Sequence, residues 1–226
     1  LAKQPQHTLG IPGAKVTHIC FTGFVGREDA EMCAKINGIP NVVDSPEEMI
    51  GKVDAVIIAT DIGDEHVERC RPFVEAGIPM FGFDTEVADM SYLVTYAGSD
   101  NYNAGKVCGE DLVAKCPDGG PIIVLDSPTM QSVVDRTNGF LDAIEGNGFE
   151  VVAQIDCMGN QEQGNLNGTD ALTAHPDAVA IFGGNDPTAL GAAAAAEAAG
   201  STALIYGVDG SPDIKALIAE GKVTGS

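Results

Sequence analysis

The chain has 226 residues, of which 44% are hydrophobic, enough for one large or two small domains with a buried core. Its 33 acidic and 12 basic residues give a formal net charge of −21, which would repel nucleic acids and anionic membranes. We therefore expect no nucleic-acid partner. No apolar run approaches the roughly 20 residues of a membrane-spanning helix, so we expect no membrane insertion either.

Short apolar runs alternate with helical patterns along the chain. The expected strands are 16–21, 41–43, 55–60, 79–84, 121–126, 151–156, 178–183 and 203–209. The expected helices lie near 28–36, 46–51, 64–76, 103–115, 130–147, 161–174, 187–199 and 212–220. The strand residues are continuously apolar rather than alternating, which indicates burial on both faces. This pattern predicts an α/β fold with parallel sheets covered by helices.

Several helix starts carry a capping residue followed by proline. Ser45 and Ser211 each precede a proline and an acidic first turn. Asp186 likewise precedes Pro187 and is expected to cap the helix that follows. The helix expected at 187–199 is almost pure alanine. Alanine favours the helix and has little bulk, so this helix is expected to lie close against a sheet.

Two stretches of the chain share one plan. Residues 54–84 and 177–209 each begin with Asp-Ala-Val, contain a strand, a helix ending in Ala-Gly and a second strand, and end in aspartate. This repetition suggests two similar lobes. We expect an N-terminal Rossmann-like lobe at 1–100, a linking helix and hinge at 101–120, and a C-terminal lobe at 121–226.

Polar side chains follow the predicted strands at their carboxyl ends, where open parallel sheets bind ligands. They are Asp61, Asp84, Asp126-Ser127, Asn185-Asp186 and Asp209, with Arg136 early in a following helix. Carboxylates accept hydrogen bonds, arginine donates them and asparagine does both, so a neutral sugar or polyol would satisfy this set. The alternative is that each is a turn former or helix cap.

No catalytic or metal-binding constellation is evident. The six cysteines form no Cys-x-x-Cys pair and lie at no zinc-ligand spacing from histidine, so buried small residues are expected, with disulfides as the alternative. The four histidines are scattered, without a nucleophile at a readable spacing. We therefore expect no catalytic residue, cofactor or metal, and a protein that is not an enzyme.

From about residue 79 onward the chain resembles the type I periplasmic sugar-binding proteins, the ribose-binding group in particular. The matching text includes "GSDNYNAGKVCGEDLVAK", "DRTNGFLDAI", "AIFGGNDPTALGA" and "YGVDGSPDIKALIAEGKVT". The resemblance implies two Rossmann-like lobes that close on a sugar about a hinge, an ABC importer as the membrane partner, and a periplasmic or extracellular location. Carried over by position, it implies four hydroxyl ligands: Asp84, Arg136, Asn185 and Asp209.

Residues 1–82 are instead similar to part of the NAD(P)-binding domain of the glucose–fructose oxidoreductase/inositol dehydrogenase family. However, "FTGFVGRE" at 21–28 does not have the spacing of G-x-G-x-x-G, and "GFDTEVAD" at 82–89 replaces that family's Glu-Lys-Pro motif. An oxidoreductase, or an inactive fragment of one, is the alternative function. A junction near 77–79 would make the chain a chimera, a composite or a natural hybrid, and an engineered scaffold without ligand is a third reading. Both ends are expected to be incomplete.

Overall fold

The computed structural model describes residues 13–21, 26–59, 64–84 and 89–226. The chain divides into two compact units, Leu1–Ala97 and Gly98–Ser226. Helix α3 (Asn101–Lys115) therefore belongs to the second unit, although the sequence analysis assigned 101–120 to a link. The physical reason is that α3 packs along α4 (Gln131–Ile144), with which it shares a hydrophobic core.

The first unit contains short parallel strands. One pair joins β1 (His18–Ile19) to β2 (Asn41–Val42), and a three-stranded sheet has the order β3-β4-β5. The elements of this unit, in chain order, are β1, α1 (Arg27–Asn37), β2, the 3₁₀ turn η1 (Pro46–Met49), β3 (Val56–Ile58), α2 (Asp64–Glu75), β4 (Met80–Phe83), the 3₁₀ turn η2 (Met90–Tyr92) and β5 (Thr95–Ala97).

The three-stranded sheet of the first unit is covered on one face. Cys70 and Phe73 of α2 pack with Met80 of β4 in a small buried cluster. On the other face, the side chains of Ile57 and Phe83 are about half exposed. The expectation that these strands are buried on both faces is therefore wrong for this sheet, because only the face of Met80 carries a buried cluster among the described residues.

The second unit contains a four-stranded parallel sheet in the order β7-β6-β8-β9. Each strand alternates with a helix, as the sequence predicts, so the expected α/β class is confirmed. The elements after α3 are β6 (Gly120–Asp126), α4, β7 (Phe149–Asp156), α5 (Gln161–Ala174), β8 (Ala180–Gly183), α6 (Asp186–Ala199), β9 (Leu204–Tyr206) and α7 (Pro212–Ala219).

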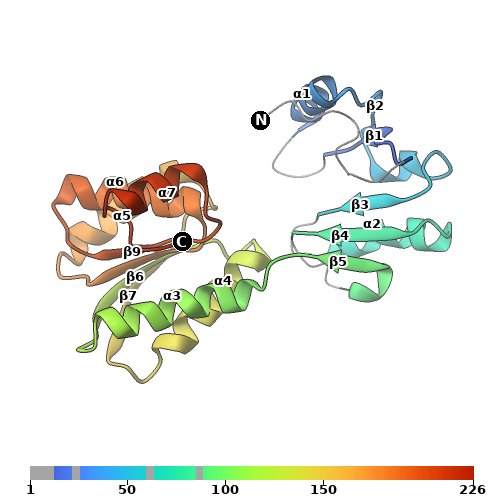
Figure 1. Cartoon of the computed structure of the whole chain (residues 1–226). Helices are drawn as coiled ribbons and strands as arrows, with labels where there is room; N and C mark the ends of the chain where they lie inside the picture. The colour runs from blue at the N-terminus through green and yellow to red at the C-terminus, as the bar shows by residue number, and fades with distance from the viewer. Residues whose placement is uncertain (1–12, 22–25, 60–63, 85–88) are drawn as a thin grey trace. The chain divides into compact units, whose positions relative to one another are not determined.

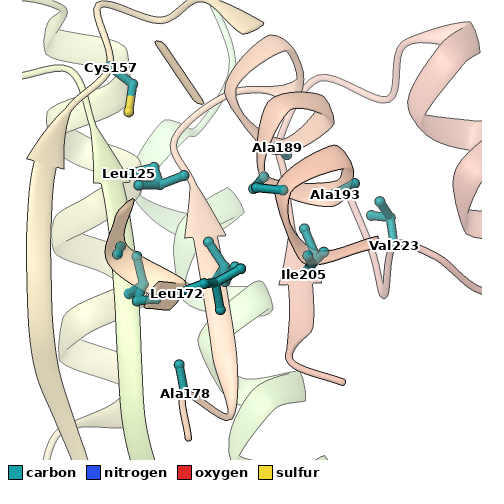
Figure 2. Close-up of a cluster of buried hydrophobic side chains, with 14 of the residues drawn as sticks. Leu125, Cys157, Leu172, Ala178, Ala189, Ala193, Ile205 and Val223 are labelled. Carbon is teal, nitrogen blue, oxygen red and sulfur yellow. The ribbon is translucent and has the colours of Figure 1, made fainter. Parts of the chain in front are cut away.

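The sheet of the second unit separates two cores. The sheet lies between a layer of α3 and α4 and a layer of α5, α6 and α7 (Figure 1). Ile122 and Val124 of β6 pack with the α3/α4 layer, whereas Ile123 and Leu125 pack with the layer of α5, α6 and α7. All four residues are fully buried, because neighbouring strand residues point to opposite faces and each face is covered. Figure 2 shows the second core, where alanines of α6 lie beside strand residues such as Leu125.

Glycines let α3 and α4 approach at backbone distance. A Cβ atom added to Gly105 of α3 would lie 1.7 Å from the carbonyl oxygen of Arg136 on α4. One added to Gly139 of α4 would lie 1.9 Å from the carbonyl oxygen of Tyr102 on α3. Both are impossible contacts, so the helix crossing depends on glycine at these two positions. The same crossing fixes the backbone of Arg136.

The strand order of the second unit reverses beside β6. The chain runs from β6 to β7 on one side and then crosses to β8 on the other. Ligands of open α/β sheets bind outside the carboxyl ends of the strands at such a reversal. The loops after β6, β8 and β9 are therefore where a site is expected. No helix in the described part of the chain is long and apolar enough to cross a membrane.

Candidate functional site

The side chain of Arg136 lies at the carboxyl edge of the second unit's sheet and is almost fully buried. Its Nε donates to Oδ1 of Asn101 at 2.9 Å, and Nη1 donates to the carbonyl oxygen of Gly184 at 3.1 Å. Nη2 forms an ion pair with Oδ1 of Asp209 at 3.1 Å. The guanidinium is thus held by α3 and by the loops that follow β8 and β9. These contacts use three of its five N–H groups, so two remain available. The arginine is fixed and keeps donor capacity for a ligand.

Asp209 follows β9 and adopts an unusual backbone conformation. Its φ is +127°, a region that side-chain-bearing residues rarely occupy. Its side chain remains 43% exposed. Burial raises the pKa of the Asp209 carboxyl, and the neighbouring Arg136 guanidinium opposes that rise. Backbone strain of this kind is often found where a side chain must point in a functional direction.

Asn185 has a structural role at the edge it shares with Arg136. It is the N-cap of α6, where its Oδ1 accepts from the N–H of Thr188 at 3.0 Å, and its Nδ2 donates to the carbonyl oxygen of Gly159 at 3.0 Å. The cap is therefore Asn185 and not Asp186, which is the first helical residue. One amide N–H and one oxygen lone pair of Asn185 lie outside these bonds, so capping leaves hydrogen-bonding capacity.

Asp84 lies in the first unit, at the end of β4. Its side chain is exposed and its φ is +66°. Its N–H donates to the carbonyl oxygen of Ala97 at 3.1 Å, which holds this turn against the end of β5. Within the described residues, the side-chain-bearing positions with positive φ are Asp84, Met158 and Asp209. Two of the four residues expected to bind a ligand thus carry strained backbones.

Two aspartates that follow strands, Asp126 and Asp61, were not among the four residues expected to bind the ligand. Asp126 is buried, and its carboxylate accepts hydrogen bonds from Ser127 N–H, Thr137 Oγ1 and Gln154 Nε2, so it is engaged within the fold. Asp61 lies outside the described residues.

Asn101, which holds Arg136, was not among the expected site residues. It is 9% exposed at the start of α3. From the sequence, residue 101 was expected to open the linking helix and hinge at 101–120. A buried asparagine requires hydrogen-bonding partners, so its burial would have marked Asn101 as a candidate. That burial depends on the packing of α3 and is not visible in the sequence.

All six cysteines are free thiols, so the alternative of disulfides is not observed. The expected burial holds for Cys70, Cys108 and Cys157, whereas Cys20, Cys33 and Cys116 are partly exposed. Burial raises the pKa of Cys108 to about 11 and also raises the pKa values of Cys70 and Cys157. Across 13–21, 26–59, 64–84 and 89–226, no group of three or more histidine, cysteine, aspartate or glutamate side chains is placed to hold a metal ion.

Curated relatives of the chain are binding proteins for sugars. It is 33% identical over 151 residues to the ribose import binding protein RbsB of Escherichia coli, a match that covers 66% of this chain and 51% of that protein. It is 29% identical over 202 residues to a D-ribose/D-allose-binding protein of Pseudomonas aeruginosa, covering 83% of this chain and 63% of that protein. The chain thus spans about half to two thirds of the length of these relatives.

Solved structures share the fold. One solute-binding protein of an ABC transporter, from Actinobacillus succinogenes with bound D-allose, superposes with a TM-score of 0.73 at 26% identity, covering 91% of this chain and 82% of that one. Another, from Bacillus halodurans with bound myo-inositol, has a TM-score of 0.77 at 22% identity and covers 95% and 82% of the two chains. The second similarity bears on the fold alone.

One family model covers most of the chain, residues 42–226, under the description "Periplasmic binding protein domain". The match continues through Gly77–Pro79, where the sequence analysis expected a junction. Residues 42–82, which were compared with an oxidoreductase, are thus part of the matched domain, and the chimera finds no support. The relatives are named as binding proteins rather than enzymes. The chain belongs to the periplasmic binding protein domain family.

Proposed function

We propose that this chain binds a small neutral sugar or polyol through Asp84, Arg136, Asn185 and Asp209. The observation that carries the proposal is the fixed pair of Arg136 and Asp209, joined at 3.1 Å at the carboxyl edge of the second unit's sheet. The pair offers donors from a buried guanidinium and acceptors from a partly exposed carboxylate. Every hydroxyl of a sugar both donates and accepts, so one ligand can use both groups.

The ligand class follows from the charge balance at this edge. Arg136 is already paired with Asp209, so the pair is close to neutral and leaves no surplus positive charge for an anionic ligand. The chain as a whole has a net charge of −21, which further disfavours anions. The relatives named for ribose and allose, and the structure with bound D-allose, support the same class of ligand.

We further propose that the chain is the solute-binding component of an ABC importer and works in the periplasm or outside the cell. The support is the family match and the relatives named as import binding proteins. Closure of the two lobes on the sugar, with Asp84 as the contact from the first unit, stays a prediction. Small-angle scattering with and without sugar would test it, because closure should reduce the radius of gyration.

Isothermal titration calorimetry with D-ribose, D-allose, D-apiose and myo-inositol tests the binding proposal. We expect at least one saturable isotherm, and weaker binding of the same sugar by Asp209→Ala and by Arg136→Ala. Each loss of a charged hydrogen-bonding partner should cost about 1.5–3 kcal/mol, which is about tenfold to a hundredfold in affinity. Glu150→Gln, on the exposed side of edge strand β7, is the matched control and should bind normally. Unchanged affinity in both site variants would rule the assignment out.

A further inference from the structure

The carboxylate of Asp186 is buried beside the loop that carries Asp209. The residue is 1% exposed, although it bears a carboxylate. Its Oδ2 accepts a hydrogen bond from the N–H of Ser211 at 2.6 Å, and its Oδ1 accepts one from Oγ of Ser226 at 2.6 Å. A carboxylate so far from solvent requires partners of this strength.

The same residue also holds the other end of that loop. The backbone N–H of Asp186 donates to the carbonyl oxygen of Val208 at 2.8 Å. Asp186 therefore fixes residue 208 through its backbone and residue 211 through its side chain. Asp209 and Gly210 lie between these two attachments, so one residue fastens both ends of a short arch.

The middle of the arch is tied to the same carboxylate through Ser226. Its Oγ accepts from the N–H of Gly210 at 3.0 Å while donating to Asp186. The arch needs this support, because Asp209 has a φ of +127° and a strained backbone persists only where its surroundings impose it. The contact with Arg136 cannot impose this backbone conformation by itself, because it holds only the carboxylate of Asp209 and leaves the backbone of that residue free to relax.

We propose that Asp186 is a positioning residue for the sugar site: it imposes the conformation of residues 208–211 that aims the Asp209 carboxylate at the ligand and at Arg136. This inference rests on the proposed function. In it, Asp186 acts through Asp209 and makes no contact with the sugar. Its burial and its bonds to Ser211 and Ser226 assign the carboxylate to the protein rather than to a ligand.

The test is a double-mutant cycle measured by calorimetry with D-ribose and D-allose. Asp186→Asn keeps the size of the side chain but places an amide donor against the N–H of Ser211 or the hydroxyl of Ser226. We expect affinity to fall about tenfold in the otherwise unchanged chain. In the Asp209→Ala background the same substitution should change affinity less than twofold, because there is then no carboxylate to position.

Two further variants separate positioning from a general loss of stability. Ser226→Ala removes the bond to Gly210 and one bond to Asp186, and should lower affinity about threefold even if Asp186→Asn folds poorly. Ile123→Val, a truncation in the core facing α5 and α6, should lower the melting temperature and leave affinity unchanged.

A readout without sugar distinguishes failure of this inference from failure of the proposed function. Amide hydrogen exchange at Gly210 and Ser211 should accelerate about tenfold in Asp186→Asn relative to Ile123→Val. If exchange accelerates but no sugar binds the unchanged chain, Asp186 does hold residues 208–211 in place, but the proposed function is wrong. The role of Asp186 in sugar binding then falls with it. Unchanged exchange, or an equal loss of affinity with and without Asp209, would overturn the positioning role.

Discussion

Arg136 and Asp209 form an ion pair whose two members differ in exposure. The arginine side chain is 9% exposed and the aspartate side chain 43% exposed, with 3.1 Å between Nη2 and Oδ1. The arginine is held from behind by Asn101 and Gly184, so the pair is anchored on its buried side. The aspartate faces outward and can accept a ligand hydroxyl without breaking the pair.

Replacement of Arg136 by lysine should weaken sugar binding about tenfold or more. A single ammonium cannot reproduce the fork that reaches Asn101, Gly184 and Asp209 together, so the remaining donors lose their direction. Calorimetry measures the loss. The matched control is Arg71→Lys, at an exposed ion pair with Glu68 in the first unit, which should leave affinity unchanged. Normal affinity in Arg136→Lys would show that charge alone is needed.

As the pH is lowered, sugar affinity should begin to fall at a higher pH than it would if Asp209 had the ordinary pKa of an aspartate. Burial raises the pKa of the Asp209 carboxyl above its usual value, although the neighbouring Arg136 guanidinium opposes part of the rise. The protonated carboxyl loses its charge and its pairing with Arg136. Calorimetry in a series of acidic buffers, on the unchanged chain and on Asp209→Asn, tests this. The variant should bind weakly at every pH, with a flatter profile; identical profiles would contradict the assignment.

The same shift has a consequence for stability. Because the pKa of Asp209 is higher in the folded than in the unfolded protein, the folded state binds the proton more tightly. The resulting contribution to the free energy of unfolding is present below the unfolded pKa and is lost as pH rises through the folded pKa. In urea titrations, the unchanged chain should therefore gain stability relative to Asp209→Asn as pH falls through that window. A gain in the opposite direction would show that the Arg136 pair outweighs burial.

Gly105→Ala should reduce both stability and sugar affinity, because its Cβ would lie 1.7 Å from the carbonyl oxygen of Arg136 and force α3 away from α4. Gly168→Ala on α5 is the matched control, because an added Cβ would lie 3.3 Å from the Cβ of Ala195, a tight contact that offsets the gain of about 1 kcal/mol in helix propensity. We expect a clear drop in melting temperature for Gly105→Ala and little change for Gly168→Ala. Equal effects of the two would contradict the close helix crossing.

Cys108 should resist thiol reagents in the folded protein. Burial raises its pKa to about 11, so at about pH 8 only about one thiol in a thousand is ionised. Reaction with an aromatic disulfide reagent, followed by peptide mass spectrometry, should leave Cys108 unmodified in buffer and modified in guanidinium chloride. Rapid labelling under native conditions would mean that the α3/α4 core opens readily.

Most of the secondary structure could be predicted from the sequence, because each βα unit carries its own local signals. The helix predicted at 161–174 is observed at those bounds, and the strand predicted at 121–126 begins one residue earlier. Strand β5 (Thr95–Ala97) was missed, since it is three residues long and two of them are exposed. Its apolar pattern is too short to be read.

The candidate site was predictable in its residue types but not in its contacts. Aspartate and asparagine after strands are visible in the sequence, and the parallel arrangement places their positions on one edge of a sheet. The bond from Arg136 to Asn101 joins residues 35 apart and depends on the crossing of two helices. The dual use of Asn185, as a helix cap and as a donor to Gly159, likewise requires coordinates.

The most direct test of the account is a crystal structure of the chain with a sugar that calorimetry shows to bind. We predict hydroxyl oxygens within hydrogen-bonding distance of the Arg136 guanidinium and of the Asp209 carboxylate, with their 3.1 Å contact retained. A sugar bound elsewhere, with these two side chains contacting only protein and water, would contradict the account.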